Sequence, residues 1–332
     1  MNPENQPGLL SGHFISLPKA ELHLHLEGSL QPVTVCALAS RHGTPFPGEE
    51  VTRRYAYKDF LGFIEAFKWV SSLLRDPADY VLALRDLGEQ LVEQNVIYAE
   101  ITLSVGVMLL RHQSVERNFE AIVAEAEAFA ARGLKLNFVF DAVRQFGADA
   151  AMRVVAAAER CASNSIVGFG IGGDELSVAA KEFAPVYDKA GSIGLHRLMH
   201  AGEIGGAKEI WEAIRLLGVE RIGHGIAAMH DPELMAWLAA RRIPLEICPQ
   251  SNVRTGALAR QLGIAGASIE QHPLPLLFRS GVPIVLSTDD PAMFHTSLVS
   301  EYERAALMGL QENELEQMVK NGFEYSFKHH ER

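Results

Sequence analysis

The sequence predicts an α/β fold, a (β/α)8 TIM barrel with extra helices after the first strand and at the C-terminus. Eight short apolar runs recur along the 332 residues, and stretches with helical periodicity separate them. Such alternation builds a parallel sheet with helices outside, and eight repeats favour one closed barrel over two domains. Because no linker rich in proline, glycine or serine interrupts the chain, we expect residues 1–332 to form one domain, with 1–16 as a loose N-terminal arm.

Strands are predicted from the short apolar runs, and helices from apolar positions three and four residues apart. Strands are expected at 20–27, 96–103, 134–142, 166–171, 195–200, 221–226, 243–249 and 282–288. After the first strand we expect helices at 32–42, at the phenylalanine-rich stretch 59–69 and at 78–94, with a loop at 48–54. Further helices are expected at 114–132, 147–161, 177–190, 206–218, 232–241, in pieces at 256–280, and at 297–328.

An open, doubly wound sheet is the alternative fold. Such a sheet usually carries a glycine-rich phosphate loop after an early strand, whereas here Glu27-Gly28-Ser29 follows the first strand. The glycine-rich run at 168–173 has the wrong spacing for that loop. In addition, the acidic pair Asp174-Glu175 directly after it would repel a pyrophosphate.

The composition indicates which classes of partner and which cellular compartment to expect. A formal net charge of -11 and a pI of about 5.6 argue against nucleic acid or an anionic membrane surface as a partner. The three cysteines are few, odd in number and far apart, which indicates a reducing compartment. We find no signal-peptide pattern and no apolar run of about 20 residues. We therefore expect a cytoplasmic protein, and its oligomeric state stays open.

Two histidines, His23 and His25, stand near the end of the first expected strand. Side chains two residues apart on a strand point to the same side of it. The pair can therefore offer two imidazoles to one metal ion, with Gly28 closing the strand. Taken alone, this pattern is equally consistent with two histidines that make ordinary hydrogen bonds.

Polar residues also gather where other expected strands end. In a (β/α)8 barrel the carboxyl ends of the strands carry the active site. The fourth, fifth, sixth and eighth strands are followed by titratable residues at Asp174, Glu175, His200, Glu203, His224, Asp289 and Asp290. Chance placement would not concentrate histidine and carboxylate residues at these ends. The pattern therefore predicts one functional site at this end of the barrel.

Three imidazoles and a carboxylate, without a cysteine cluster, describe a site for a divalent metal ion. Zinc is the first choice, and Fe2+ or another divalent ion is the alternative. The predicted ligands are His23, His25, His200 and Asp289, which leave one position for water. A metal ion there would lower the pKa of that water to about 7. No lysine that could bridge two ions ends the fourth strand, so we expect one ion per chain.

Three residues remain for proton transfer and substrate contact. His224 lies between two glycines and could orient the attacking water or take its proton, or it could be a core histidine bonded to backbone. Glu203 could be a general acid, which requires a raised pKa, or it could mark the start of the next helix. Asp290 could reach the substrate because the backbone can turn before Pro291.

Together these motifs resemble the adenosine/adenine deaminase family of the metal-dependent amidohydrolases. The resemblance covers nearly the whole chain, starting at Leu17. It rests on HLHLEG at 23–28, GGDE at 172–175, HAGE at 200–203, RIGHG at 221–225, CPQSN at 248–252 and TDDP at 288–291, which occur in the family's order. The other zinc deaminase design carries a PCxxC motif, which this chain lacks.

The resemblance implies a barrel with one zinc ion on the four predicted ligands, which removes the 6-amino group of a purine by hydrolysis. It implies that His224 guides the attack on C6 and that Glu203 protonates N1. Asp290 would contact N7 while carrying or sharing a proton, and the backbone of Gly173 would contact N3. The implied substrate contacts are His25, Glu27, Gly173 and Asp290. The helix expected at 59–69 resembles the family's lid, which excludes water.

The chain departs from the classical adenosine deaminases at Glu27, where those enzymes carry an aspartate that meets the ribose 5′-hydroxyl. Glutamate resembles the adenine deaminases and the bacterial branches that act on modified nucleosides such as 6-aminodeoxyfutalosine. The segments that follow Asn252 and Asp289 look closer to the nucleoside branches. Arg254 could pair with the carboxylate that aminodeoxyfutalosine carries, or it could be a surface arginine. Adenosine is the first expected substrate, aminodeoxyfutalosine the second and adenine the third.

Two rival functions stay open on the sequence alone. A metal-dependent hydrolase of esters or amides could use the same barrel, although the set of Glu203, His224 and Asp290 suits a ring nitrogen. A catalytically silent barrel could use its metal ion for binding alone. The intact ligand set and Glu203 argue against this second rival.

Overall fold

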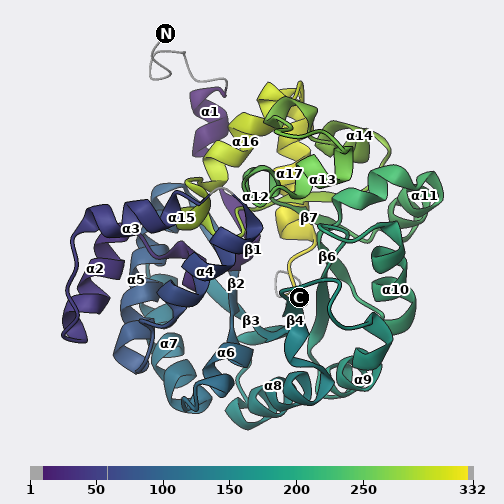
Figure 1. The fold of residues 1–332 in the computed structure, drawn as a ribbon. Coiled ribbons are helices and arrows are strands. Elements are labelled where there is room, and N and C mark those ends of the chain that lie inside the picture. The colour runs from purple at the N-terminus through teal and green to yellow at the C-terminus, as the bar shows by residue number, and fades with distance from the viewer. Residues whose placement is uncertain (1–9, 58, 328–332) are drawn as a thin grey trace.

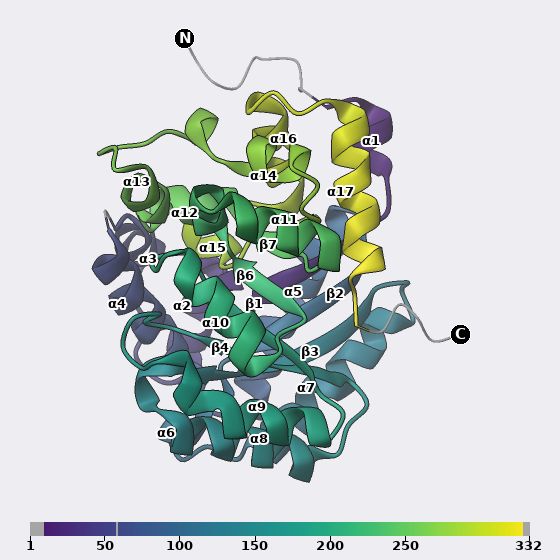
Figure 2. The ribbon, with the colours of Figure 1, turned by 90° about the vertical axis from the view of Figure 1, so that its right-hand side faces the viewer.

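The computed structural model describes residues 10–57 and 59–327, and its strands and helices form a (β/α)8 barrel (Figures 1 and 2). Eight parallel strands pair in chain order, each with the next. They are β1 (Lys19–His25), β2 (Val96–Leu103), β3 (Lys135–Val143), β4 (Ile166–Gly172), β5 (His196–Ala201), β6 (Arg221–His224), β7 (Leu245–Ile247) and β8 (Ile284–Leu286). The predicted fold class is confirmed, and each predicted strand is found.

The chain closes the barrel through the residues that follow β8. The backbone N–H of Asp289 donates to the carbonyl oxygen of His23 at 3.0 Å, and the N–H of His25 donates to that of Asp289 at 2.8 Å. Asp289 thereby extends the last strand along the carboxyl end of β1. This pairing places the carboxylate of Asp289 beside the two histidines of β1.

Helices cover the outside of the barrel (Figure 1). The helices before β2 are α1 (Gly12–Ser16), α2 (Pro32–Arg41), α3 (Gly48–Tyr55), α4 (Phe60–Ser71) and α5 (Pro77–Glu93). Those between β2 and β7 are α6 (Val105–Leu110), α7 (Val115–Ala130), α8 (Ala148–Cys161), α9 (Ala184–Ser192), α10 (Ala207–Leu217) and α11 (Pro232–Arg241). The remainder are α12 (Pro249–Arg254), α13 (Ala257–Leu262), α14 (Leu274–Arg279), α15 (Pro291–Phe294), α16 (Leu298–Leu307) and α17 (Glu312–Glu324).

The predicted extra helices are present after β1 and at the C-terminus, with different bounds. The expected helix 297–328 is divided into α16 and α17, because Gly309 between them has a φ of +88° that ends the first helix. The first strand ends at His25 rather than at residue 27, and a 3-10 turn over Glu27–Ser29 follows it. None of the helices in the described ranges has the length and hydropathy of a membrane span.

Two local predictions were wrong. The segment 48–54 was expected to be a loop, but it forms α3, whose buried residues Val51 and Tyr55 lie one turn apart. The hydroxyl of Tyr55 donates to the carbonyl oxygen of Leu30 at 2.9 Å and so ties this helix to the chain after β1. The arm was expected to be loose throughout, yet α1 buries Phe14; residues 1–9 of the arm lie outside the described part.

A fully buried arginine fills the amino-terminal end of the barrel. Arg221 at the start of β6 forms ion pairs with Glu100 on β2 and with Glu246 on β7, the latter at 2.6 Å. It also donates to the carbonyl oxygen of Tyr325 at 2.8 Å and lies 3.7 Å above the ring of Phe327. The positive charge is therefore compensated by two carboxylates and joined to the C-terminal segment. Removing it would leave two buried carboxylates without the positive charge that compensates them.

We expect Arg221→Met to lower the free energy of unfolding by about 3–5 kcal/mol, because Glu100 and Glu246 would stay buried and uncompensated. The measurement is urea unfolding followed by circular dichroism. Arg132→Met is the matched control, since Arg132 pairs with Glu89 on the surface, and the unfolding midpoint should barely change. Equal, small effects of the two substitutions would contradict this assignment.

Candidate active site

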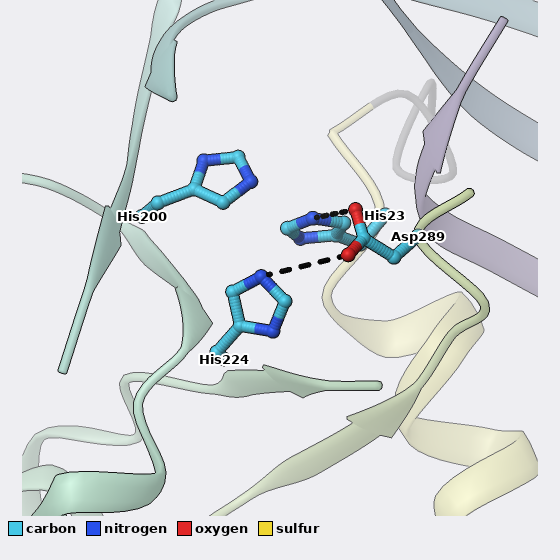
Figure 3. A group of neighbouring side chains, drawn as sticks. All are labelled: His23, His200, His224 and Asp289. Atoms are coloured by element: carbon cyan, nitrogen blue, oxygen red, sulfur yellow. Dashed lines mark ion pairs between the residues drawn. The ribbon is translucent and has the colours of Figure 1, made fainter. Parts of the chain in front are cut away.

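Histidine and aspartate side chains from four strand ends meet at the carboxyl end of the barrel. His23 comes from β1, His200 from β5, His224 from β6, and Asp289 follows β8. Figure 3 shows the four side chains pointing toward one another. One nitrogen or oxygen atom from each lies within 4.8 Å of the corresponding atoms of the other three. The structure thus brings together residues far apart in the sequence, as predicted from the strand ends.

His25 also lies at this centre. Its Nε2 is 3.3 Å from Oδ1 of Asp289, and its ring centroid is 5.4 Å from that of His23 and 5.5 Å from that of His200. The sequence analysis placed His25, and not His224, among the metal ligands. The geometry brings both histidines to the centre, so both are candidates by position.

The donor set fits a divalent metal ion. Nε2 of His23 is buried, makes no hydrogen bond to the described residues, and lies 3.4 Å from Oδ1 of Asp289. The opposite nitrogen, Nδ1, lies 2.9 Å from the carboxylate of Glu246. This carboxylate fixes the ring and directs Nε2 to the centre, the arrangement typical of metal-binding histidines. Nitrogen and oxygen donors without sulfur suit zinc or a similar first-row ion.

Glu246 was missed by the sequence analysis. Burial alone would raise its pKa, but the charge of Arg221 and the contact with His23 hold the pKa below its usual value. The ionised carboxylate of Glu246 contacts both Arg221, toward the amino-terminal end of the barrel, and His23, toward the carboxyl end. The signal was present in the sequence, since Glu246 is a charged residue inside an otherwise apolar expected strand.

The backbone is strained at two of these strand ends. His224 has a φ of +60° and Asp289 a φ of +67°, in the left-handed region that non-glycine residues rarely adopt. Both residues end a strand and aim their side chains at the centre of the site. Strained backbone of this kind concentrates at functional sites, where surrounding contacts hold it in place.

Glu203 lies at the rim of this centre. Its Oε2 is 3.6 Å from Nε2 of His224, and its Oε1 accepts a hydrogen bond from the hydroxyl of Thr255 at 3.3 Å. Burial, followed by the nearby charges of Asp289 and Glu175, raises the pKa of Glu203 to about 8. The carboxyl group is therefore protonated at neutral pH, which is the state that a general acid needs.

A second glutamate fixes the loop that carries Glu203. The carboxylate of Glu175 accepts hydrogen bonds from the backbone N–H groups of Gly202, Ile204 and Gly205, the last two at 2.8 and 2.7 Å. These donors lie on both sides of Glu203. Glu175 therefore has a structural role here, and the same is true of Asp174, which accepts from the N–H of Leu176.

Asp290 packs directly on Gly28, and this contact explains the glycine. A Cβ atom at position 28 would lie 1.7 Å from Oδ1 of Asp290, so any side chain there would displace the carboxyl group. That oxygen is buried and has no hydrogen-bond partner. Burial and the charge of Asp289 raise the pKa of Asp290, which favours its protonated form, the form that can donate a hydrogen bond. Gly28 was predicted to close the strand, and the structure adds this packing role.

A cavity of about 190 Å³ opens beside the cluster. Its inner wall includes His25, His200, Glu203, His224, Asp289, Asp290 and Gly173. Gly173 has a φ of +98°, and a Cβ atom there would lie 2.5 Å from Oε1 of Gln145, so only glycine fits. Asp141 at the end of β3 also lines the wall; burial raises its pKa to about 8. The sequence analysis missed Asp141, although it is the one acidic residue of the expected strand 134–142.

The outer wall of the cavity is apolar. It includes Phe60, Phe63, Ile64 and Phe67 from α4, Val107 from α6 and Phe146 after β3. The helix expected at 59–69 is thus part of the pocket wall. Among the described residues of the wall, Lys68 is the one lysine or arginine. Its ammonium group lies on the surface, 2.9 Å from Oε1 of Glu65.

Glu27 and Arg254 lie close to the site but not on the cavity wall. Oε1 of Glu27 accepts from the N–H of Ser104 at 3.0 Å, while Oε2 is buried without a partner. Ser104 itself lines the cavity. Arg254 donates to the carbonyl oxygen of Tyr55 at 3.0 Å and lies 5.0 Å above the ring of Tyr57. Its Nε is buried without a hydrogen-bond partner among the described residues, and Lys68, unlike Arg254, lines the cavity.

We expect the protein to bind one zinc ion per chain, measured by elemental analysis after dialysis. His200→Ala removes a central donor and should lower zinc affinity at least 10–100-fold, because each remaining donor keeps its place but one bond is lost. His196→Gln is the control, since His196 lies on the same strand and pairs with Glu220 outside the cluster. Stoichiometric zinc in His200→Ala would contradict the site.

Comparisons with known proteins agree with this geometry. The adenosine deaminase family model matches residues 18–332. The aminodeoxyfutalosine deaminase of Streptomyces coelicolor is 38% identical over 328 residues, which cover 97% of this chain and 83% of that protein. The adenine deaminase of Rhizobium meliloti is 33% identical over 313 residues, which cover 94% of both proteins.

Two solved structures show the same barrel. The adenine deaminase of Arthrobacter aurescens has a TM-score of 0.86 at 30% identity and covers 93% of this chain and 94% of its own. A zinc-bound amidohydrolase of Burkholderia ambifaria has a TM-score of 0.88 at 25% identity and covers 98% of this chain and 90% of its own. Sequence and structure lead to one conclusion: this chain belongs to the adenosine deaminase family, and it is a purine-related hydrolytic deaminase.

Proposed function

We propose that this protein hydrolyses the 6-amino group of a purine nucleoside, with one zinc ion in its active site. Among the candidate substrates we favour aminodeoxyfutalosine over adenosine and adenine. The observation that carries the proposal is Glu203, a protonated carboxyl group on the cavity wall, next to a cluster of imidazoles and a carboxylate. A proton donor beside a metal site is what attack on a purine ring requires.

The proposed zinc ligands are His23, His25, His200 and Asp289. When bound, zinc would lower the pKa of a water molecule and so make a nucleophile available near neutral pH. Two features of the chain support this ligand set. Nε2 of His23 is buried, makes no hydrogen bond to the described residues and faces Asp289, while Glu246 holds the ring from the other side. The remaining histidine, His224, is then free to act on the attacking oxygen.

Glu203 would give its proton to N1 of the purine. Protonation breaks the aromatic character of the ring and makes C6 open to attack. The raised pKa of Glu203 keeps the proton available at neutral pH. Once it has lost this proton, its carboxylate can take one from the attacking water and pass it to the departing amine. Ammonia then leaves, and the product is a 6-oxopurine.

Asp290 and Gly173 would orient the purine ring. The protonated carboxyl of Asp290 has a buried oxygen without a partner, and N7 of a purine is an acceptor that could receive its proton in a hydrogen bond. Gly173 lines the same wall, and its backbone can approach the ring closely because it has no side chain. Together the two contacts would place C6 toward the metal site.

The outer wall supports a substrate with a large group at N9. A ribose alone offers hydroxyl groups, whereas this wall is built from Phe60, Phe67, Val107 and their apolar neighbours. An apolar extension that ends in a carboxylate would bury carbon surface there and meet Lys68 at the entrance. The unpartnered oxygen of Glu27 could accept from a sugar hydroxyl. Relatives that are named aminodeoxyfutalosine deaminases support the same choice.

The experiment is to measure ammonia release by the zinc-loaded protein with aminodeoxyfutalosine, adenosine and adenine. We expect the largest kcat/KM for aminodeoxyfutalosine. Lys68→Met should raise the KM of this substrate by about tenfold, equivalent to about 1.4 kcal/mol, and leave the KM of adenosine unchanged. Lys189→Met is the control, because Lys189 pairs with Glu159 on the surface of α9. A larger kcat/KM for adenosine than for aminodeoxyfutalosine would contradict the proposed substrate. If none of the three compounds is turned over, the proposed function is wrong.

We expect Glu203→Gln to lower kcat by about 10²–10⁴-fold while zinc stays bound, because glutamine cannot transfer a proton. In the parent protein kcat/KM should fall as the pH rises above about 8, since Glu203 then loses the proton that N1 must receive. This decline at high pH should disappear from the residual activity of Glu203→Gln. Its persistence there would assign the titration to another group.

A further inference from the structure

A line of hydrogen bonds connects the start of α14 with His224 in the active site. It runs through His272 and Asn252, and all three side chains are at most 3% exposed. The backbone N–H of Leu274 donates to Nδ1 of His272 at 3.1 Å. Nε2 of His272 lies 3.2 Å from Oδ1 of Asn252, and Nδ2 of Asn252 lies 3.1 Å from Nδ1 of His224.

The direction of each of the three hydrogen bonds follows from the first one, which the backbone N–H of Leu274 donates to His272. A backbone N–H can only donate, so Nδ1 of His272 is an acceptor and its ring proton sits on Nε2. That proton is donated to the carbonyl oxygen of Asn252. The amide NH2 of Asn252 then faces His224 and donates to Nδ1. His224 therefore carries its own proton on Nε2.

The opposite direction of these hydrogen bonds is not possible for a neutral His272. If the amide of Asn252 were turned round, its NH2 would donate to Nε2 of His272. His272 would then have to accept at both ring nitrogens, which a neutral imidazole cannot do. Burial lowers the pKa of His272 to about 3, so this ring is neutral at physiological pH. Only one placement of the protons on His272, Asn252 and His224 satisfies all three hydrogen bonds.

We propose that His272 and Asn252 are positioning residues that hold His224 in the tautomer with a proton on Nε2. His224 then acts as a hydrogen-bond donor to the attacking oxygen and not as a general base. Its Nε2 faces the site, 3.6 Å from Oε2 of Glu203 and 3.9 Å from Oδ2 of Asp289. The catalytic part of this inference rests on the proposed function, but the tautomer can be measured without turnover.

This assignment decides where the proton of the attacking water goes. As the new C–O bond forms, one O–H bond of the water breaks, and His224 has no free nitrogen lone pair in the site to receive the proton. The carboxylate of Glu203, which has already protonated N1, is the acceptor. His224 instead donates to the oxygen while charge develops on it, which stabilises the transition state.

The test is nitrogen NMR of the zinc-loaded protein with 15N-labelled histidine, together with steady-state kinetics on the best substrate of the panel. The signals of His224 are identified by their loss in His224→Gln. We expect the parent protein to show a proton on Nε2 of His224 and a bare Nδ1. Asn252→Asp places an acceptor opposite Nδ1 and should move the proton there, with kcat lowered by about 10²–10⁴-fold and KM little changed.

Two substitutions of His272 separate positioning from folding. His272→Gln keeps an N–H donor for Asn252 and should retain most of the tautomer and of kcat, whereas His272→Leu should lose both. His42→Gln is the control, because the ring of His42 also makes a side-chain hydrogen bond, to the carboxylate of Asp79, but away from the site. A proton on Nδ1 of His224 in the parent protein, or an unchanged tautomer in Asn252→Asp, would overturn the proposal. A parent protein that shows the Nε2 proton but turns over no purine would contradict the proposed function and leave the hydrogen-bonded line in place.

Discussion

The site depends on how the barrel closes. Two backbone hydrogen bonds join β1 to Asp289, and they bring the end of the last strand beside the two histidines of the first. The same pairing holds Asp289 in a strained backbone conformation that turns its carboxylate toward the imidazoles. His200 and His224 reach this point because their strands end at the same edge of the barrel. The hydrogen bonds that close the barrel therefore also bring Asp289 into the candidate metal site.

Buried charge is arranged differently at the two ends of the barrel. At the amino-terminal end, Arg221 forms ion pairs with Glu100 and Glu246 in the interior. At the carboxyl end, burial raises the pKa of both Glu203 and Asp290 and so favours their protonated forms. Glu246 links the ends through His23. One barrel thereby supplies an ionised residue that orients a ligand and neutral acids that can donate protons.

The strands and the principal site residues could be predicted, because both follow from local pattern. Apolar runs give the strands, and the rule that barrel sites lie at strand ends picks out His200, Glu203 and Asp289. Helix α3 was missed, because its two buried residues are too few to show a period. Asn252 and His272 were not given a role, since they are 20 residues apart and meet only in the folded chain. The contacts of Arg254 with Tyr55 and Tyr57 could not be predicted either, because these residues also meet only in the folded chain.

The most direct test of this account is the position of the metal ion. We would grow crystals of the zinc-loaded protein and measure anomalous diffraction at the zinc edge. The account predicts one peak, about 2.0–2.2 Å from donor atoms of His23, His25, His200 and Asp289, with His224 outside the bonding distance. A peak bonded to His224 in place of His25 would contradict it, because His224 would then be a ligand and could not donate a hydrogen bond to the attacking oxygen.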